Sequence, residues 1–285
     1  YMAMDEKGLG RRLQEARQKA GLTQQQLCHQ ANLSFSTLTK IERGAIKSPS
    51  IFTVQSIAAA LGVGLDELVG TQPPSLSNRN LKTTKSGVRF VYFDVNGCLV
   101  HFYQGAFAKL AEATGAPSDV VESAFWHYND DVCRGIITQN DFNQKLADRL
   151  GVESVDWQKY YLEAVEPILE MQDLLKWTSE QYKFGLLTNI MPGLVNAMRR
   201  EGIIPNLPYD SIIDSSEVAA IKPESKIYEI AQERAGVAPA EILLIDDSRV
   251  NLMAAERLGW HVLWFDDARP ETAVQRVREA LQPKD

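Results

Sequence analysis

The sequence contains no run of about eighteen consecutive apolar residues, although hydrophobic residues make up 45% of its 285 positions. A membrane-spanning helix needs roughly 20 such residues, so no span is expected. Residues 1–10 also lack an apolar segment, and we therefore expect no secretory signal. These absences favour a cytoplasmic location without membrane contact.

Cysteine is scarce as well. The three thiols, Cys28, Cys98 and Cys133, stand far apart among apolar neighbours. Disulfides persist mainly in oxidising compartments, and an odd number of thiols cannot pair completely. No Cys/His pair has the spacing of a zinc site. The sequence therefore predicts buried, reduced thiols in a cytosolic protein.

Charge of both signs is present, but its distribution is uneven along the chain. Residues 1–70 carry 8 basic against 6 acidic residues, and residues 71–86 carry 3 basic residues and no acidic one. Residues 87–285 carry 19 basic against 31 acidic residues, which accounts for the net charge of −7. Because an acidic surface repels DNA, any phosphate contact is expected from the first two segments.

The chain divides at a polar stretch, residues 71–87, which contains two prolines and has no hydrophobic periodicity. Such composition is typical of a linker. Every segment before it has helical periodicity, whereas β-rich apolar runs alternate with helical patterns after it. We therefore predict an all-α domain over residues 1–70 and an α/β domain with a parallel sheet over residues 88–285.

The first domain is predicted to consist of short helices. Apolar residues recur with helical spacing from Leu9 to Ala20, and Gly21 ends that helix. Thr23 and Ser34 are residues that cap helices, and each stands before a helical pattern. Further patterns predict helices over residues 35–43, 54–61 and 65–69. Two short helices joined by a tight turn commonly place the second in the DNA major groove.

Three segments of this domain resemble the phage-repressor/Cro (Xre) helix-turn-helix family: residues 21–27, 34–44 and 61–68. The resemblance implies that the protein binds double-stranded DNA. Because a single helix-turn-helix usually binds weakly, we also expect a homodimer, which presents two such helices at a fixed spacing. The implied DNA contacts are Gln24, Ser34, Phe35, Ser36, Thr39, Lys40, Arg43 and Lys47. The alternative is a five-helix module that binds protein. Phe35 fits a thymine methyl group or the edge of its own core equally well, and Lys40 fits a guanine or a solvated face.

In the second domain, three buried strands are predicted to end in polar residues: Asp94, Thr188 with Asn189, and Asp246 with Asp247. Because ligands of open α/β sheets bind at the carboxyl ends of strands, these side chains should converge. Carboxylates such as Asp94 and Asp247 suit Mg²⁺. The hydroxyl of Thr188, the amide of Asn189 and the ammonium of Lys222 suit a phosphate.

These motifs, in this order, resemble the haloacid dehalogenase (HAD) superfamily, in the branch with a helical cap, here over residues 101–175. The resemblance implies a Rossmann-like fold with Asp94, Thr188 and Lys222 as catalytic residues, Asp94 being the nucleophile. It also implies Mg²⁺ bound by Asp94, Asp247 and the backbone carbonyl of Asn96, with Asn251 supporting the loop. Asn96, Thr188, Asn189 and Lys222 would bind the ligand. Candidate pocket residues in the cap are Trp126, His127, Tyr128 and Arg134, although His127 fits a surface or core position better.

One departure decides between an enzyme and a sensor. Phosphatases of this superfamily carry a second Asp two residues after the nucleophile, and this chain carries Asn96 there. An amide cannot act as a general acid, and losing that group costs about 10²–10⁴-fold in rate. The favoured hypothesis is a transcriptional regulator that senses a phosphorylated small molecule or nucleotide with weak or no turnover. An active Mg²⁺-dependent phosphatase, or a domain used only for dimerisation or partner binding, are the alternatives.

Overall fold

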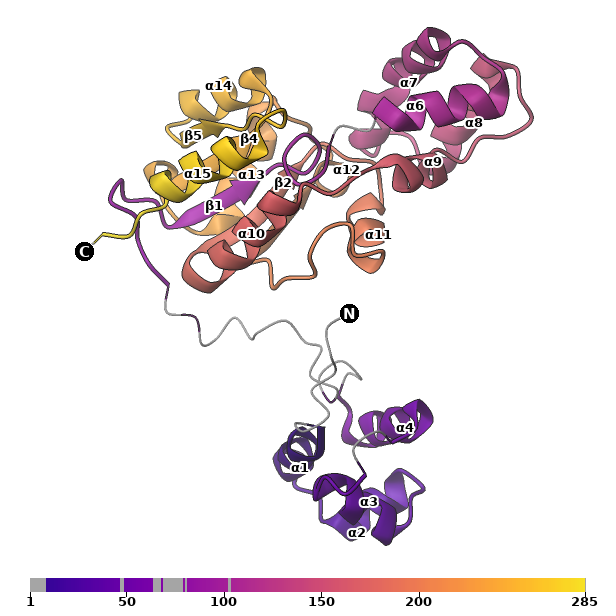
Figure 1. Cartoon of the computed structure of the whole chain (residues 1–285), viewed down its shortest axis with the longest axis vertical. Helices are drawn as coiled ribbons and strands as arrows, with labels where there is room; N and C mark the ends of the chain where they lie inside the picture. Colours follow the sequence, from indigo (N-terminus) through magenta and orange to yellow (C-terminus); the bar gives the residue numbers. More distant parts are fainter. Residues whose placement is uncertain are drawn as a thin grey trace. The chain divides into compact units, whose positions relative to one another are not determined.

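The computed structural model describes residues 9–46, 49–63, 68, 79, 81–101 and 104–284. Contacts within the chain separate two compact units at the boundary between Ser75 and Leu76 (Figure 1). In the described part of the chain, no helix is long and apolar enough to cross a membrane. The three cysteines are buried and form no disulfide, in agreement with the sequence.

The first unit is helical. Its helices are α1 (Leu9–Lys19), α2 (Gln24–Gln30), α3 (Phe35–Glu42) and α4 (Ile51–Leu61). Thr23 caps α2 by accepting a hydrogen bond from the backbone of Gln26, and Ser34 caps α3 in the same way from Thr37, as the sequence predicts. Their inward-facing apolar side chains, including Leu27, form one core. The fifth helix predicted over residues 65–69 lies outside the described residues, except for Leu68.

The second unit is built on one five-stranded parallel sheet with the strand order β3-β2-β1-β4-β5. Its strands are β1 (Phe90–Phe93), β2 (Lys183–Thr188), β3 (Ser211–Asp214), β4 (Ile242–Asp246) and β5 (His261–Trp264). Phe93 at the end of β1 is in register with Leu186 and Ile245 on its two neighbours. The central strands β2, β1 and β4 therefore present their carboxyl ends at the same edge.

Helices cover both faces of this sheet (Figure 1). On one face, Val91 and Phe93 pack in the core that also holds α10 (Leu169–Gln181) and α15 (Pro270–Ala280). On the other face, Phe90 and Tyr92 pack with α13 (Ser225–Ala235) and α14 (Arg249–Arg257). Shorter elements are α11 (Leu194–Arg200), α12 (Ser215–Val218) and the 3₁₀ turn η2 (Pro239–Glu241). Burial on both faces explains why β1 and β4 are buried at every residue, whereas β5 is exposed or half-buried along its length.

A four-helix cap is inserted between β1 and the rest of the sheet. It comprises α6 (Gln104–Thr114), α7 (Ser118–Cys133), α8 (Gln139–Leu150) and α9 (Trp157–Ala164). The rings of Phe107, Phe125 and Trp157 pack against one another in edge-to-face and tilted arrangements, with centroids 4.5–5.3 Å apart, and so hold the cap together. The next helix, α10, packs on β2 and α15. It therefore belongs to the core layer, although its first residues fall within the range 101–175 expected for the cap.

The end of the segment expected as a linker, residues 71–87, is joined to the α/β unit. The backbone of Lys82 donates to Gln181, and Thr84 pairs with Pro283 near the C-terminus. Arg79 forms an ion pair of 2.5 Å with Asp210. Residues 79 and 81–87 are thus part of the second unit.

Candidate functional site

Polar side chains gather where the central strands end. Asp94 directly follows β1, Thr188 ends β2 and Asp246 ends β4, and all three are buried. Because these strands are adjacent and parallel, their ends place the three side chains at one edge of the sheet. The sequence predicted this convergence from the strand ends alone.

Lys222 lies between two of these carboxylates. Its Nζ is 2.9 Å from Asp94 Oδ2 and 2.6 Å from Asp246 Oδ2, and its side chain is 1% exposed. Burial by itself disfavours the ammonium, but the carboxylates of Asp246 and Asp94 outweigh burial and raise the pKa of Lys222. A charge this deep is tolerated only when it is paired, so Lys222 is a fixed cation at the centre of the site.

Asn189 holds the backbone of Lys222 in place. Its Oδ1 accepts a hydrogen bond of 2.7 Å from the backbone nitrogen of Lys222, and its Nδ2 donates one of 2.9 Å to the carbonyl oxygen. The sequence predicted that this amide would contact an anion directly. The contacts that the structure contains are instead with Lys222, and only one hydrogen on Nδ2 is left for a ligand.

The carboxylate of Asp246 makes its hydrogen bonds within the protein. Besides Lys222, its carboxylate accepts hydrogen bonds from the backbone of Ser248, at 2.8 Å, and from the amide of Asn251, at 3.2 and 3.3 Å. The expected support of this loop by Asn251 is therefore seen as a direct contact. Of the two adjacent aspartates, Asp247 is therefore the better candidate to bind a metal ion through its carboxylate.

Three carboxylates crowd together here, since oxygens of Asp94, Asp246 and Asp247 lie within 4.8 Å of one another. Gly97 makes room for them: a Cβ at that position would approach Asp247 Oδ2 to 2.2 Å, and its φ of +79° also favours glycine. Burial, opposed by Lys222 and reinforced by the neighbouring aspartates, raises the pKa of Asp94. Burial and the Asp246 carboxylate raise the pKa of Asp247 to about 6.

One ammonium does not balance three carboxylates. An oxygen-rich, negatively charged cluster is the donor set that Mg²⁺ takes, so the residues present fit the metal. Asp94 and Asp247, with the backbone carbonyl of Asn96, are the predicted ligands. Asp246 lies in the same cluster, but its oxygens are already occupied by Lys222 and Asn251.

Thr188 is consistent with the prediction that a phosphate binds next to the metal. Its hydroxyl oxygen is buried and has no hydrogen-bond partner in the described part of the chain. A buried hydroxyl without a partner costs about 1–3 kcal/mol, a cost that a bound phosphate oxygen would remove. The orphaned hydroxyl therefore fits a ligand-binding role.

Asn96, the residue that replaces the expected general acid, is hydrogen-bonded to a residue of the cap. Its Oδ1 accepts a hydrogen bond of 2.6 Å from the hydroxyl of Tyr161 on α9. Burial raises the pKa of Tyr161, so its hydroxyl stays protonated. Sequence reasoning missed Tyr161, because its spacing of four residues from Trp157 marks only the inner face of a helix.

A small cavity of about 10 Å³ separates cap and core beside Asn96. That volume holds about one water molecule. Its walls include Phe125, Asn129, Trp157, Tyr161 and Met191.

The predicted pocket residues Trp126, His127, Tyr128 and Arg134 are not among the residues that line this cavity. Helix α7 turns the face of Phe125 and Asn129 to the cavity, and the adjacent positions therefore point elsewhere. Arg134 instead forms an ion pair of 2.6 Å between cap and core with Glu224.

In the helical unit, α3 presents the predicted DNA-reading side chains. Ser34, Phe35, Ser36, Lys40 and Arg43 are exposed. Ser36 and Lys40 are four residues apart and share one face of the helix. Leu38 and Ile41 are fully buried on its opposite side.

Two of the predicted DNA contacts also form hydrogen bonds within the helical unit, and a third lies outside the described residues. The hydroxyl of Ser34 caps α3, and Thr39 is half-buried, with its hydroxyl donating to the carbonyl of Phe35. Lys47 lies outside the described residues. Ser36 and Lys40, both exposed on α3, therefore remain predicted DNA contacts.

Gln24 differs from the expectation of a simple phosphate contact. Its Nε2 donates a hydrogen bond of 2.6 Å to Glu42, whose carboxylate also forms a buried ion pair of 2.7 Å with Arg17. This network ties the start of α2 to the end of α3. Gln24 therefore helps to fix α2 against α3, and the predicted phosphate contact would have to use its other amide hydrogen.

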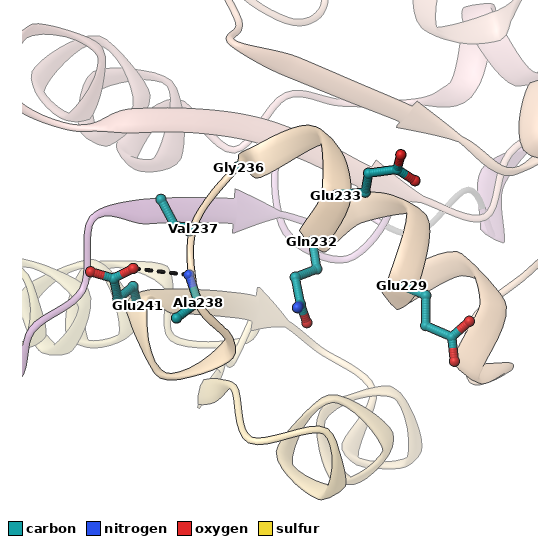
Figure 2. A pocket seen from close by; sticks show the side chains of 7 residues that line it. All are labelled: Glu229, Gln232, Glu233, Gly236, Val237, Ala238 and Glu241. Atoms are coloured by element: carbon teal, nitrogen blue, oxygen red, sulfur yellow. Dashed lines mark hydrogen bonds between the residues drawn. The ribbon is translucent and has the colours of Figure 1, made fainter.

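A second hollow lies at the opposite edge of the sheet, just before β4 begins (Figure 2). Its rim carries Glu229, Glu233 and Glu241, and Glu241 accepts a hydrogen bond from the backbone of Ala238. Three carboxylates repel phosphate, so this hollow does not compete with the site around Lys222.

Both units match known families. A family model described as helix-turn-helix matches residues 13–68, and one described as haloacid dehalogenase-like hydrolase matches residues 88–259. Both resemblances inferred from the sequence are thus confirmed, and so is the fold class.

Individual relatives agree with this division. Acyl-CoA dehydrogenase family member 10 of Mus musculus is 26% identical over 216 residues, which are 70% of this chain and 20% of that protein. The immunity repressor protein of Bacillus phage phi105 is 41% identical over 64 residues, or 22% of this chain and 44% of the repressor. The chain thus spans a minor part of either relative.

The fold is shared with a solved haloacid dehalogenase family enzyme from Bacteroides thetaiotaomicron. The two are 20% identical with a TM-score of 0.56, over 64% of this chain and 95% of the other. That enzyme, an alanine variant, was crystallised with magnesium and inorganic phosphate.

The metal site can be tested through stability. Because the pKa of Asp247 is raised, the metal-free folded state binds more protons than the unfolded state, and the free energy of unfolding falls as pH rises from about 4 to 6. Mg²⁺ should reverse this loss, and its stabilisation should be larger at pH 7.5 than at pH 5. Tryptophan fluorescence during thermal unfolding reports it, since all five tryptophans lie in the second unit.

Asp247→Asn should remove most of the Mg²⁺-dependent stabilisation, which in the wild type grows with free metal by mass action. The exposed Asp173 offers a matched control, and Asp173→Asn should respond to Mg²⁺ as the wild type does. Equal stabilisation of wild type and Asp247→Asn would show that the metal does not bind here.

Proposed function

Because this chain belongs to the haloacid dehalogenase-like hydrolase family and carries a helix-turn-helix domain before the hydrolase domain, we propose that it is a sequence-specific transcriptional regulator. In this proposal the HAD-like domain binds Mg²⁺ and a phosphorylated small molecule or nucleotide, with weak or no turnover. The observation that carries it is the amide of Asn96 beside an otherwise complete set of ionic groups around Lys222.

The residues of the site suit binding of a phosphate group. Lys222 supplies a fixed positive charge, and the unpartnered hydroxyl of Thr188 supplies a donor. Mg²⁺, held by Asp94, Asp247 and the backbone carbonyl of Asn96, neutralises charge on phosphate oxygens when bound. The cavity under the cap, beside Asn96, has room for about one water molecule, which limits solvent next to the bound group.

Turnover requires more than binding. Cleavage of a phosphate ester needs a proton for the leaving group, and water must later be activated to release the enzyme. The amide of Asn96 performs neither step, and Tyr161, whose hydroxyl contacts Asn96, has a raised pKa that makes it a poor acid. A ligand bound at this site therefore stays intact for long periods, which suits a sensor.

An active phosphatase is the second candidate. It is favoured by the position of Asp94, whose carboxylate is buried beside Lys222 as a nucleophile would need to be. In that case water or the ligand itself would supply the missing proton.

The helix-turn-helix unit is proposed to read DNA as part of a homodimer. Two recognition helices then bind half-sites about one helical turn apart, roughly 34–36 Å. The net charge of residues 87–285 is negative, so the sequence-independent attraction to DNA has to come from the N-terminal unit and residues 71–86.

The reading helix can be tested by two substitutions on its exposed face. Lys40→Ala and Ser36→Ala should each weaken binding to a selected operator by about 5–150-fold, because a lost base contact costs about 1–3 kcal/mol. Binding to random DNA should change less. Arg11→Ala, an exposed residue on α1, is the control and should affect both DNAs equally. Fluorescence anisotropy measures each affinity, and sequence-selective binding by residues 87–285 alone would contradict the assignment.

Turnover is tested by restoring the acid. The wild type should hydrolyse a generic phosphate ester poorly in the presence of Mg²⁺, and Asn96→Asp should raise the rate by about 10²-fold. Asn96→Ala is the control for the loss of the amide and should stay inactive. Brisk wild-type hydrolysis that disappears in Asp94→Asn would instead support the phosphatase.

A further inference from the structure

A hydrogen bond from Tyr161 joins the cap to Asn96 beside the predicted phosphate site. Tyr161 is 1% exposed, and its hydroxyl donates to Asn96 Oδ1 at 2.6 Å. The same hydroxyl lies 3.6 Å from the sulfur of Met198, a weak acceptor. The Tyr161 side chain thus reaches from α9 of the cap to the loop that follows β1.

This contact fixes which way the amide of Asn96 faces. A side-chain amide has an acceptor edge and a donor edge, and the acceptor edge is used by Tyr161. The donor edge, Nδ2, has no hydrogen-bond partner among the described residues. Asn96 itself lines the cavity beside the site. An outward carbonyl oxygen would repel a phosphate, whereas an N–H group attracts it.

We propose that Tyr161 is a positioning residue that holds the Asn96 amide with its NH₂ group toward the phosphate group of the ligand. The proposal rests on the proposed function and names how that site recognises its anion. Asn96 then donates to a phosphate oxygen at the position where a phosphatase of this family has its acid. The substitution at position 96 becomes a binding feature as well as a loss of catalysis.

The surroundings of Asn96 should strengthen the hydrogen bond that its amide donates to a phosphate oxygen. The cavity between cap and core holds about one water molecule, so little solvent competes for the amide. Hydrogen bonds to a charged acceptor are stronger than those between neutral groups. Loss of the Asn96 donor should therefore weaken phosphate binding by about tenfold or more, and loss of its orientation by about fivefold.

A double-mutant cycle on the full chain tests the coupling, with inorganic phosphate as the probe. Calorimetry in Mg²⁺ would compare wild type, Tyr161→Phe, Asn96→Ala and the double variant. We expect Tyr161→Phe to weaken binding about fivefold in the wild type and to have no effect in Asn96→Ala. Tyr160→Phe removes a hydroxyl from the same helix without touching Asn96, and should leave binding unchanged. Equal losses in both backgrounds would mean that Tyr161 acts through packing, and would overturn the proposal.

A direct measurement on the wild type avoids any dependence on how well the variants fold. In ¹⁵N-edited NMR spectra, the side-chain NH₂ signals of Asn96 are identified by their loss in Asn96→Ala. Saturating phosphate should shift these signals strongly. If phosphate binds and they do not move, the proposal fails while the proposed function stands. If phosphate does not bind to the wild type in Mg²⁺, the proposed function fails and this inference fails with it.

Discussion

The ammonium of Lys222 is buried between Asp94 and Asp246, and the α/β unit is arranged around that charge. A buried cation needs both carboxylates, and breaking such a pair typically costs about 3–5 kcal/mol. Asp94 follows β1 and Asp246 ends the neighbouring strand β4. Asn189 holds the backbone of Lys222, and Asn251 donates a hydrogen bond to the Asp246 carboxylate. The requirement to keep this charge paired therefore fixes the edge of the sheet at which a ligand can bind.

The charges and polar groups that remain without partners in this site indicate which ligands it would bind. Asp247 adds a third carboxylate, which calls for a cation, and the hydroxyl of Thr188 has no partner, which calls for an acceptor. A metal and a phosphate together satisfy both. Asn96 completes the binding groups without supplying an acid. Under the proposed function, such a site would retain its ligand, and the helix-turn-helix domain on the same chain would respond to the occupied state.

Much of this was readable from the sequence, because it depends on local patterns. Helix caps such as Thr23 and Ser34 and the polar ends of β1, β2 and β4 follow from neighbouring residues. The misses involve orientation and distance along the chain. The sequence does not show which cap residues face the core, so Phe125 and Asn129, which line the cavity beside Asn96, were not among the predicted pocket residues. The contact of Tyr161 with Asn96 joins residues 65 positions apart, which no local pattern reveals.

The central claim is that the occupied HAD-like site changes how the chain binds DNA. The most direct test is operator affinity of the full chain in Mg²⁺, measured with and without a phosphorylated ligand shown by calorimetry to occupy the site. The account predicts a change of about 5–150-fold, and an equal change in ligand affinity when operator is present, because coupling between two sites is reciprocal. Identical operator affinities in the empty and occupied states would contradict it.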